Sequence, residues 1–245
     1  MRAIPPFCRC GLLALLGPLV SCGEPEPPAD APGVASLPLA SAPIATGETM
    51  LLSGTGDTLR LSALDPENGR QLLVRTQSGQ SRDSTAVVID VATKAPLESF
   101  RLAATAGGDT VTASIEYGGG FEGQARLTLT SGGDTRGENL RTPPPALDAG
   151  QLPLTLTALS FDRVDSLHFN YVAPFEQDAL AARLLVGPPE TLRTGGVSLA
   201  ARSVLLQVSG LEERYWLAEQ PPHAILRLEE ITRARMWTRA EPPTP

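Results

Sequence analysis

Residues 110–129 read TVTASIEYGGGFEGQARLTL, and this stretch decides the fold class of the 245-residue chain. Before the three glycines an apolar or small side chain stands at every second position, and the segment after them repeats this period. A period of two is typical of a half-buried strand, and a glycine run between two such strands is typical of a hairpin turn. The stretch therefore predicts an antiparallel hairpin made of residues 110–117 and 121–129.

Similar short patterns recur along the rest of the chain. They predict further strands over residues 71–76, 85–91, 97–103, 166–172, 180–186, 199–208, 214–218 and 224–231. The 23 glycines and 23 prolines, against 4% aromatic residues, add frequent turns and a thin aromatic core. We therefore expect an all-β, mainly antiparallel fold, either a single curled sheet or a partly closed β-barrel, with at most one short helix.

The one candidate helix covers residues 148–161. Asp148 would cap its first turn, and Leu152, Leu156 and Leu159 would share one face. Pro153 falls near the first turn, where proline is tolerated.

The N-terminal segment has the pattern of a bacterial export signal. Two arginines precede an uncharged run over residues 11–21, which is too short to cross a membrane. The run ends in LVSC at residues 19–22, which resembles the lipobox of bacterial lipoproteins. The resemblance implies cleavage between Ser21 and Cys22 and attachment of acyl chains such as palmitate, through a diacylglyceryl group, to the Cys22 thiol. The alternative is an ordinary signal peptide cut at another residue.

Cysteine usage fits export. Cys8 and Cys10 would leave with the signal and Cys22 would carry lipid, so the mature chain could form no disulfide. Cys8 and Cys10 are one residue apart with no histidine nearby, which is not a zinc-site spacing.

The charge balance bears on partners and location. The chain has 20 basic and 27 acidic residues, a net charge of -7, and losing Arg2 and Arg9 with the signal leaves about -9. An acidic chain is not expected to bind nucleic acid or anionic headgroups, so membrane attachment would depend on the acyl chains. Gly23 follows the cysteine where aspartate signals inner-membrane retention in enteric bacteria. This favours the periplasmic face of the outer membrane.

The mature chain divides into three parts. Residues 22–47 hold the lipidated cysteine and six prolines without a periodic apolar face, which predicts a disordered tether that contributes nothing to folding stability. Residues 48–239 predict a single β-rich domain. Residues 240–245 predict a disordered tail.

Three stretches within residues 70–235 resemble the family described as domain of unknown function 3108. They are VIDVATKAPL at residues 88–97, the DAGQLPL segment at 148–154, and a closing hairpin with its tryptophan at 208–227. The resemblance implies an exported β-rich protein. Members of that family have no assigned activity, so no functional residue carries over.

Catalytic patterns are sparse. The chain has no G-x-S-x-G motif and two histidines. His168 with Asp165 could supply two parts of a hydrolytic triad, although a solvent-facing strand histidine is the simpler interpretation. His223 follows two prolines and is expected in a turn. Glu116 and Glu122 flank the hairpin and could form a glycosidase pair, but alternation places both on the solvent face.

Four further motifs are interpreted as turns or exposed segments. Residues 65–69 resemble the start of a calcium loop without its downstream glutamate. The tetrapeptide GGDT at residues 107–110 and 132–135 predicts hairpin-type turns. Residues 118–123 match G-x-G-x-x-G, but a strand follows where phosphate binding needs a helix. Lys94, the sole lysine, lies outside any glycine-rich loop.

These observations predict a non-catalytic, lipid-anchored envelope protein with no metal or cofactor. Two roles stay open. One is an interaction or structural module that acts on another envelope protein. The other is a LolA-like carrier of a lipid or other apolar ligand inside the curled sheet. Small inward residues favour such a cavity: Ala113, Gly123, Ala125 and Ala201.

Lipidation at Cys22 is directly testable. Mass spectrometry of the protein from its native membrane should show a mature chain that begins at a diacylglyceryl-modified Cys22. Cys22→Ala should yield an unlipidated protein with the same circular dichroism as the wild-type domain. A native chain that begins elsewhere, or a free Cys22 thiol, would contradict the lipobox interpretation.

Overall fold

The computed structural model describes residues 37–79, 82–104, 109–118, 123–175, 178–194 and 196–240. They form one sheet of fifteen strands, which confirms the prediction of an all-β, mainly antiparallel curled sheet. The first eight strands are β1 (Gly47–Ser53), β2 (Thr58–Ala63), β3 (Arg70–Ser78), β4 (Arg82–Asp90), β5 (Pro96–Ala104), β6 (Thr110–Tyr117), β7 (Gln124–Ser131) and β8 (Asp134–Arg141). The last seven are β9 (Ala146–Asp148), β10 (Ser166–Ala173), β11 (Asp178–Thr194), β12 (Val197–Val208), β13 (Leu211–Ala218), β14 (Ile225–Glu230) and β15 (Arg235–Arg239).

The helical segments are shorter than the predicted helix over residues 148–161. They are α1 (Leu152–Thr155) and the 3-10 turns η1 (Leu156–Ala158), η2 (Phe161–Arg163) and η3 (Ile231–Arg233). Pro153 stands in the first turn of α1 as predicted, but Asp148 belongs to β9 and does not cap the helix, which begins after Gln151. The helical run ends before Leu159, because that residue is extended and bridges to Leu39.

The strand order places the middle of the chain at both edges of the sheet. From edge to edge the order is β8 down to β1, then β15 down to β9. The first and last strands therefore pair with each other at the centre. The edge strands β8 and β9 are joined by residues 142–145 alone, so the sheet folds back on itself and remains open between two edges.

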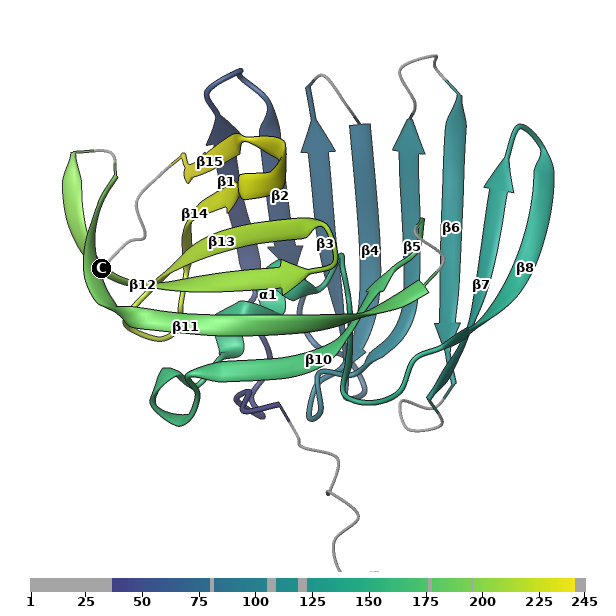
Figure 1. Ribbon diagram of the computed structural model, residues 1–245, viewed down its shortest axis with the longest axis horizontal. Coiled ribbons are helices and arrows are strands. Elements are labelled where there is room, and N and C mark those ends of the chain that lie inside the picture. The colour runs from purple at the N-terminus through teal and green to yellow at the C-terminus, as the bar shows by residue number, and fades with distance from the viewer. Residues whose placement is uncertain are drawn as a thin grey trace, which may run out of the picture. The chain divides into compact units, whose positions relative to one another are not determined.

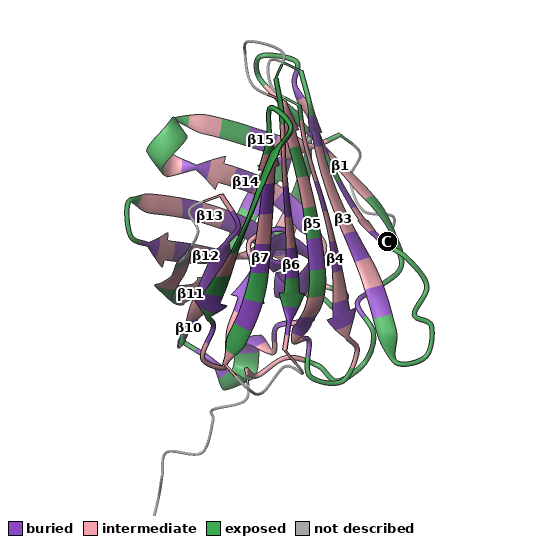
Figure 2. Ribbon diagram, turned by 90° about the vertical axis from the view of Figure 1, so that its right-hand side faces the viewer, coloured by how far each residue is buried: buried purple, intermediate pink, exposed green. Residues whose placement is uncertain are grey.

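Folding of the sheet produces two layers around one main core (Figure 1). In this view β3–β8 run vertically behind, and β10–β13 cross them in front. Steeply crossing strands are typical of orthogonal sheet packing. The core between the layers includes Leu61, Val87, Leu206, Tyr215 and Leu228. Figure 2 shows the layers from the side, with buried and exposed bands alternating along β7 as its sequence predicts.

Neighbouring side chains surround most of the small residues that were expected to border a cavity. Ala113 of β6 and Ala125 of β7 are buried against Val172 of β10. Ala201 is buried in a separate cluster with Trp216. The second layer thus packs onto Ala113 and Ala125, because the folded sheet brings β10 over β6 and β7.

The folded domain begins before β1. Residues 37–46, which we call the strap, pack against the sheet, whereas the sequence placed the start of the domain at residue 48. Ile44 is 2% exposed; its N–H donates to Gln71 Oε1 at 2.9 Å, and its carbonyl accepts from Gln71 Nε2 at 2.7 Å. The Ala40 N–H donates to the Ala158 carbonyl at 2.8 Å. Periodicity misses this docking because one buried side chain and a few hydrogen bonds carry it.

Several sequence predictions fall outside the described residues. Residues 1–36 contain the signal peptide, Ser21, Cys22 and the first part of the tether, and residues 241–245 contain most of the predicted tail.

Removal of the strap should destabilise the domain. A chain that begins at Gly47 should lose at least about 3 kcal/mol of unfolding free energy, because it loses the burial of Ile44 and leaves the buried Gln71 amide with only one of its three hydrogen bonds, to the Leu64 carbonyl. Urea unfolding beside a chain that begins at Gly23 measures this loss. A chain that begins at Val34, where the compact unit starts, is the control and should match the longer chain. Equal stability of the Gly47 chain would show that the strap is not part of the fold.

Candidate functional site

An apolar pocket of about 390 Å³, the end pocket, lies where four separate segments of the chain meet. Leu37 and Leu39 of the strap form one wall, and residues 92–96 in the turn between β4 and β5 form another. A third wall comes from the end of β6 and the start of β7. The fourth comes from residues 142–147, which precede β9 and include its first residues. Most of the lining side chains are leucine, alanine or proline, and no carboxylate is among the described lining residues.

A second hollow, the side pocket, adjoins the end pocket. Its volume is about 650 Å³, and it shares Gly123, Gln124 and Pro144 with the end pocket. The rest of its lining consists of Asn139, Leu140 and Arg141 at the end of β8, together with Pro143. The side pocket is therefore lined by a larger share of polar groups than the end pocket.

Lys94 ties the strap to the wall of the end pocket. The residue occupies a left-handed turn conformation with φ 59°, and its side chain is fully buried. Its ammonium donates hydrogen bonds to the carbonyls of Ala42, at 2.6 Å, and Val91. Burial lowers the pKa of Lys94, and the nearby charge of Asp90 opposes this in part. Because the ammonium is enclosed and already bonded, we assign Lys94 a structural role.

A buried carboxyl group stands behind the end pocket. Asp148 is fully buried and accepts hydrogen bonds from the Tyr117 hydroxyl and the Gly150 N–H, both at 2.7 Å. Burial raises the pKa of Asp148, although these two hydrogen bonds act in the opposite direction. Burial and the neighbouring Asp148 charge raise the pKa of Tyr117. Ser99 Oγ is buried beside the pair without hydrogen-bond geometry to either.

A second buried polar cluster links the two layers of the sheet. Glu230 is fully buried, accepts a hydrogen bond from Trp237 Nε1 at 3.1 Å and lies 3.9 Å from Arg75 Nη2. Glu213, opposite Glu230 in the strand register, accepts a hydrogen bond from the Tyr215 hydroxyl. Burial acts to lower the pKa of Arg75, but the carboxylate charges outweigh it and raise the pKa. These charges are matched and line neither pocket, so the cluster supports the fold.

The two histidines stand in separate environments. His168 is exposed on β10, as predicted, and Asp165 is exposed before the strand. No hydrogen bond joins them within the described part of the chain. His223 lies in a turn, as predicted; its Nδ1 is 2.9 Å from the Ala218 carbonyl oxygen, and its ring centroid is 4.2 Å from that of Phe161.

The turn predictions hold where the structure describes them. Gly132 and Gly133 have φ of 58° and 89° and join β7 to β8, as expected of a two-residue hairpin turn. The other GGDT lies partly outside the described residues. Asn68 and Gly69 also have positive φ, in the turn before β3. Gly123 is followed by β7 and not by a helix, so the G-x-G-x-x-G pattern has no helix N-terminus behind it.

The predicted acidic positions do not assemble into a described site. Glu116 is exposed on β6, opposite Arg126 in the register, and Glu122 lies outside the described residues. Within the described ranges no group of three or more histidine, cysteine, aspartate or glutamate side chains could hold a metal ion.

Of the small residues that were expected from the sequence at a cavity, Gly123 lines both pockets, but most of the other residues around the pockets were missed. Asp148 was interpreted as a helix cap, Lys94 only as a lysine outside a phosphate loop, and Arg141 was not considered. The three consecutive prolines at 143–145 were an available signal, since proline cannot donate to a strand ladder and so ends β8.

Comparison with protein-family models, curated proteins and solved structures finds no match to this chain. The resemblances noted in the sequence therefore stay predictions. Of the helices in the described residues, none is long and apolar enough to span a membrane.

The buried Asp148 predicts a specific pH dependence of stability. Its pKa is higher in the folded than in the unfolded chain, so the folded state binds more protons between these two pKa values. The free energy of unfolding of the wild type, relative to Asp148→Asn, should therefore fall as pH rises from about 4. Urea unfolding across this range measures the difference.

Tyr117→Phe provides the companion variant. It removes a donor that favours ionised Asp148, so the fall in wild-type stability with rising pH should become larger. A wild type that gains stability relative to Asp148→Asn over the same range would contradict the raised pKa.

Proposed function

We propose that this protein is a lipid-anchored lipoprotein of the bacterial envelope, whose folded sheet binds an apolar ligand in the end pocket. The end pocket is the observation that carries this proposal. Its volume of about 390 Å³ lies within the range of about 300–1,000 Å³ typical of small-molecule sites. Apolar hollows that water cannot satisfy tend to accept apolar guests.

The course of the chain supports a site held near a membrane. The strap that lines the end pocket begins at Leu37, and residues 23–36 separate it from Cys22. At about 3.1 Å per residue, the fifteen steps from Cys22 to Leu37 would span about 47 Å in an extended proline-rich segment. Lipidation at Cys22 would therefore keep the pocket within a few tens of ångströms of the membrane. We place the protein on the periplasmic face of the outer membrane.

We propose no catalytic role for this domain. The ionisable groups beside the end pocket, Lys94, Tyr117 and Asp148, are buried and bonded within the protein. Groups so enclosed can position the walls of a site but cannot reach a substrate. Binding and release of a ligand need no further chemistry.

An interaction role is the second candidate, and the outer face of the sheet favours it. Phe100 and Leu102 on β5 are 49% and 39% exposed, and Leu64, just after β2, is 49% exposed. Val74 and Ala86 extend the row beside Phe100 in the strand register. Exposed apolar patches of this kind mark contacts with other proteins. The partner would be another envelope protein.

Ligand retention tests the binding function. The native protein, extracted gently from the envelope fraction, should carry a non-covalently bound small apolar molecule in native mass spectrometry, and added fatty acid should raise the melting temperature of residues 23–245 purified without ligand. Ala95→Phe, which projects a large side chain at the pocket wall, should reduce binding at least tenfold. Ala181→Phe makes the same change at an exposed position of β11 and should bind normally.

The same measurements can also contradict the binding function. A protein free of small molecules, with a melting temperature unmoved by fatty acids, would reject the binding function. The outer-face interaction would then be the remaining candidate, and crosslinking in the intact envelope would identify the partner.

A further inference from the structure

The end pocket and the side pocket form an apolar hollow with a polar neighbour. Gly123, Gln124 and Pro144 belong to both, so the two hollows meet at these residues. The end pocket is walled mainly by leucine, alanine and proline, whereas Asn139 and Arg141 contribute to the side pocket. A ligand that bridges both hollows would need an apolar part and a polar part.

The strand register brings the polar groups together. Gln124 at the start of β7 pairs directly with Arg141 at the end of β8, so their Cα atoms are about 5 Å apart. Asn139 lies two residues earlier on β8, about 7 Å along the strand and on the same face. All three side chains are exposed. They can therefore contact one small head group together.

Arg141 contributes a positive charge to the side pocket. Among the described residues it has no hydrogen-bond or ion-pair partner, unlike Arg101 with Asp83 or Arg202 with Glu219. Because β8 is an edge strand, its one cross-strand neighbour here is Gln124. No carboxylate is among the described lining residues of either pocket. This local positive charge in a chain of net charge -7 favours an anionic group.

Lys94 cannot serve this role. Its side chain is fully buried, and its ammonium is bonded to the Ala42 and Val91 carbonyls. The anion must therefore meet Arg141 in the side pocket.

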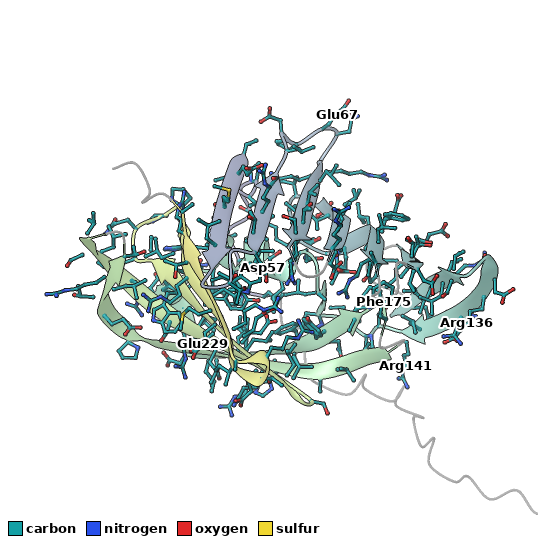
Figure 3. All side chains as sticks on the ribbon, turned by 90° about the horizontal axis from the view of Figure 1, so that it is seen from above. Asp57, Glu67, Arg136, Arg141, Phe175 and Glu229 are labelled. Atoms are coloured by element: carbon teal, nitrogen blue, oxygen red, sulfur yellow. The ribbon has the colours of Figure 1, made fainter. Side chains whose placement is uncertain are left out.

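We propose that the two pockets together bind a single-chain anionic amphiphile, with its acyl tail in the end pocket and its head group beside Arg141, Gln124 and Asn139. The proposal rests on the ligand-binding function proposed above and specifies the ligand. A fatty-acid carboxylate and the phosphate of a single-chain lipid share this chemistry. Figure 3 shows Arg141 and Arg136 at the β8 side of the molecule, with Phe175 closer to its interior.

The test is isothermal titration of residues 23–245, which contain the whole compact unit 34–245, with three probes of equal chain length. Decanoate and decyl phosphate carry the anion, and 1-decanol lacks it. At about pH 8 and low salt, decanoate should bind about fivefold more tightly than 1-decanol, as expected of one partly exposed charge-assisted contact. The ratio should shrink as salt is raised. Whichever anion binds more tightly identifies the source of the head group.

Two substitutions locate the charge. Arg141→Gln should bring decanoate to the affinity of 1-decanol while leaving 1-decanol binding unchanged. Arg183→Gln removes an exposed arginine from β11, which lines neither pocket in the described residues, and should keep the fivefold ratio.

From octanoate to dodecanoate each added methylene should tighten binding about fourfold until the end pocket is full, since a buried methylene contributes about 0.8 kcal/mol.

The outcomes separate the two proposals. If decanoate and 1-decanol bind the wild type equally, or if Arg141→Gln keeps the ratio, the anionic head group is wrong and apolar binding stands. If no probe binds, the binding function itself fails. An affinity independent of chain length would place the tail outside the end pocket and overturn the proposal.

Discussion

A connection of four residues, 142–145, constrains the rest of this structure. It joins β8 to β9, which are the opposite edges of a fifteen-stranded sheet. A fully extended chain covers at most about 3.6 Å per residue, so the facing ends of the two edge strands can lie about 18 Å apart at most. Fifteen strands spaced at about 4.8 Å would separate the edges of a flat sheet by about 67 Å. The sheet can satisfy the connection only by folding over.

Folding over has an electrostatic consequence. Polar side chains from one layer now meet the other layer away from water, and a buried charge without a partner costs several kcal/mol. Arg75 of β3 meets Glu230 of β14, and Tyr117 of β6 meets Asp148 of β9. These pairings favour one placement of the layers over slipped alternatives, whereas apolar contacts alone tolerate small shifts. The buried polar groups therefore help to select one arrangement of the two layers.

The end pocket is a product of the same connection. Residues 142–147 form one of its walls as they pass from one layer to the other. The prolines among them lack N–H groups and cannot extend either edge as a strand. Asn170 of β10 instead holds the connection by donating from Nδ2 to the Pro143 carbonyl at 2.6 Å. The strap forms another wall and is held there by Lys94, so the pocket depends on contacts between segments that are far apart in the chain.

The sequence by itself determined the features that depend on near neighbours in the chain. Strict alternation identified β6 and most of β7, and paired glycines identified the turn into β8. It missed β8 itself, where Leu140 is the one buried residue, because an edge strand exposed on both faces has no apolar period. It also extended the helix to residue 161, because it could not foresee that Leu159 pairs with Leu39. Only the tertiary structure decided the folding of the sheet, the docking of the strap and the position of the pockets. Each of these depends on contacts between segments such as 37–39, 92–96 and 142–147, which are far apart in the chain and leave no local pattern in its sequence.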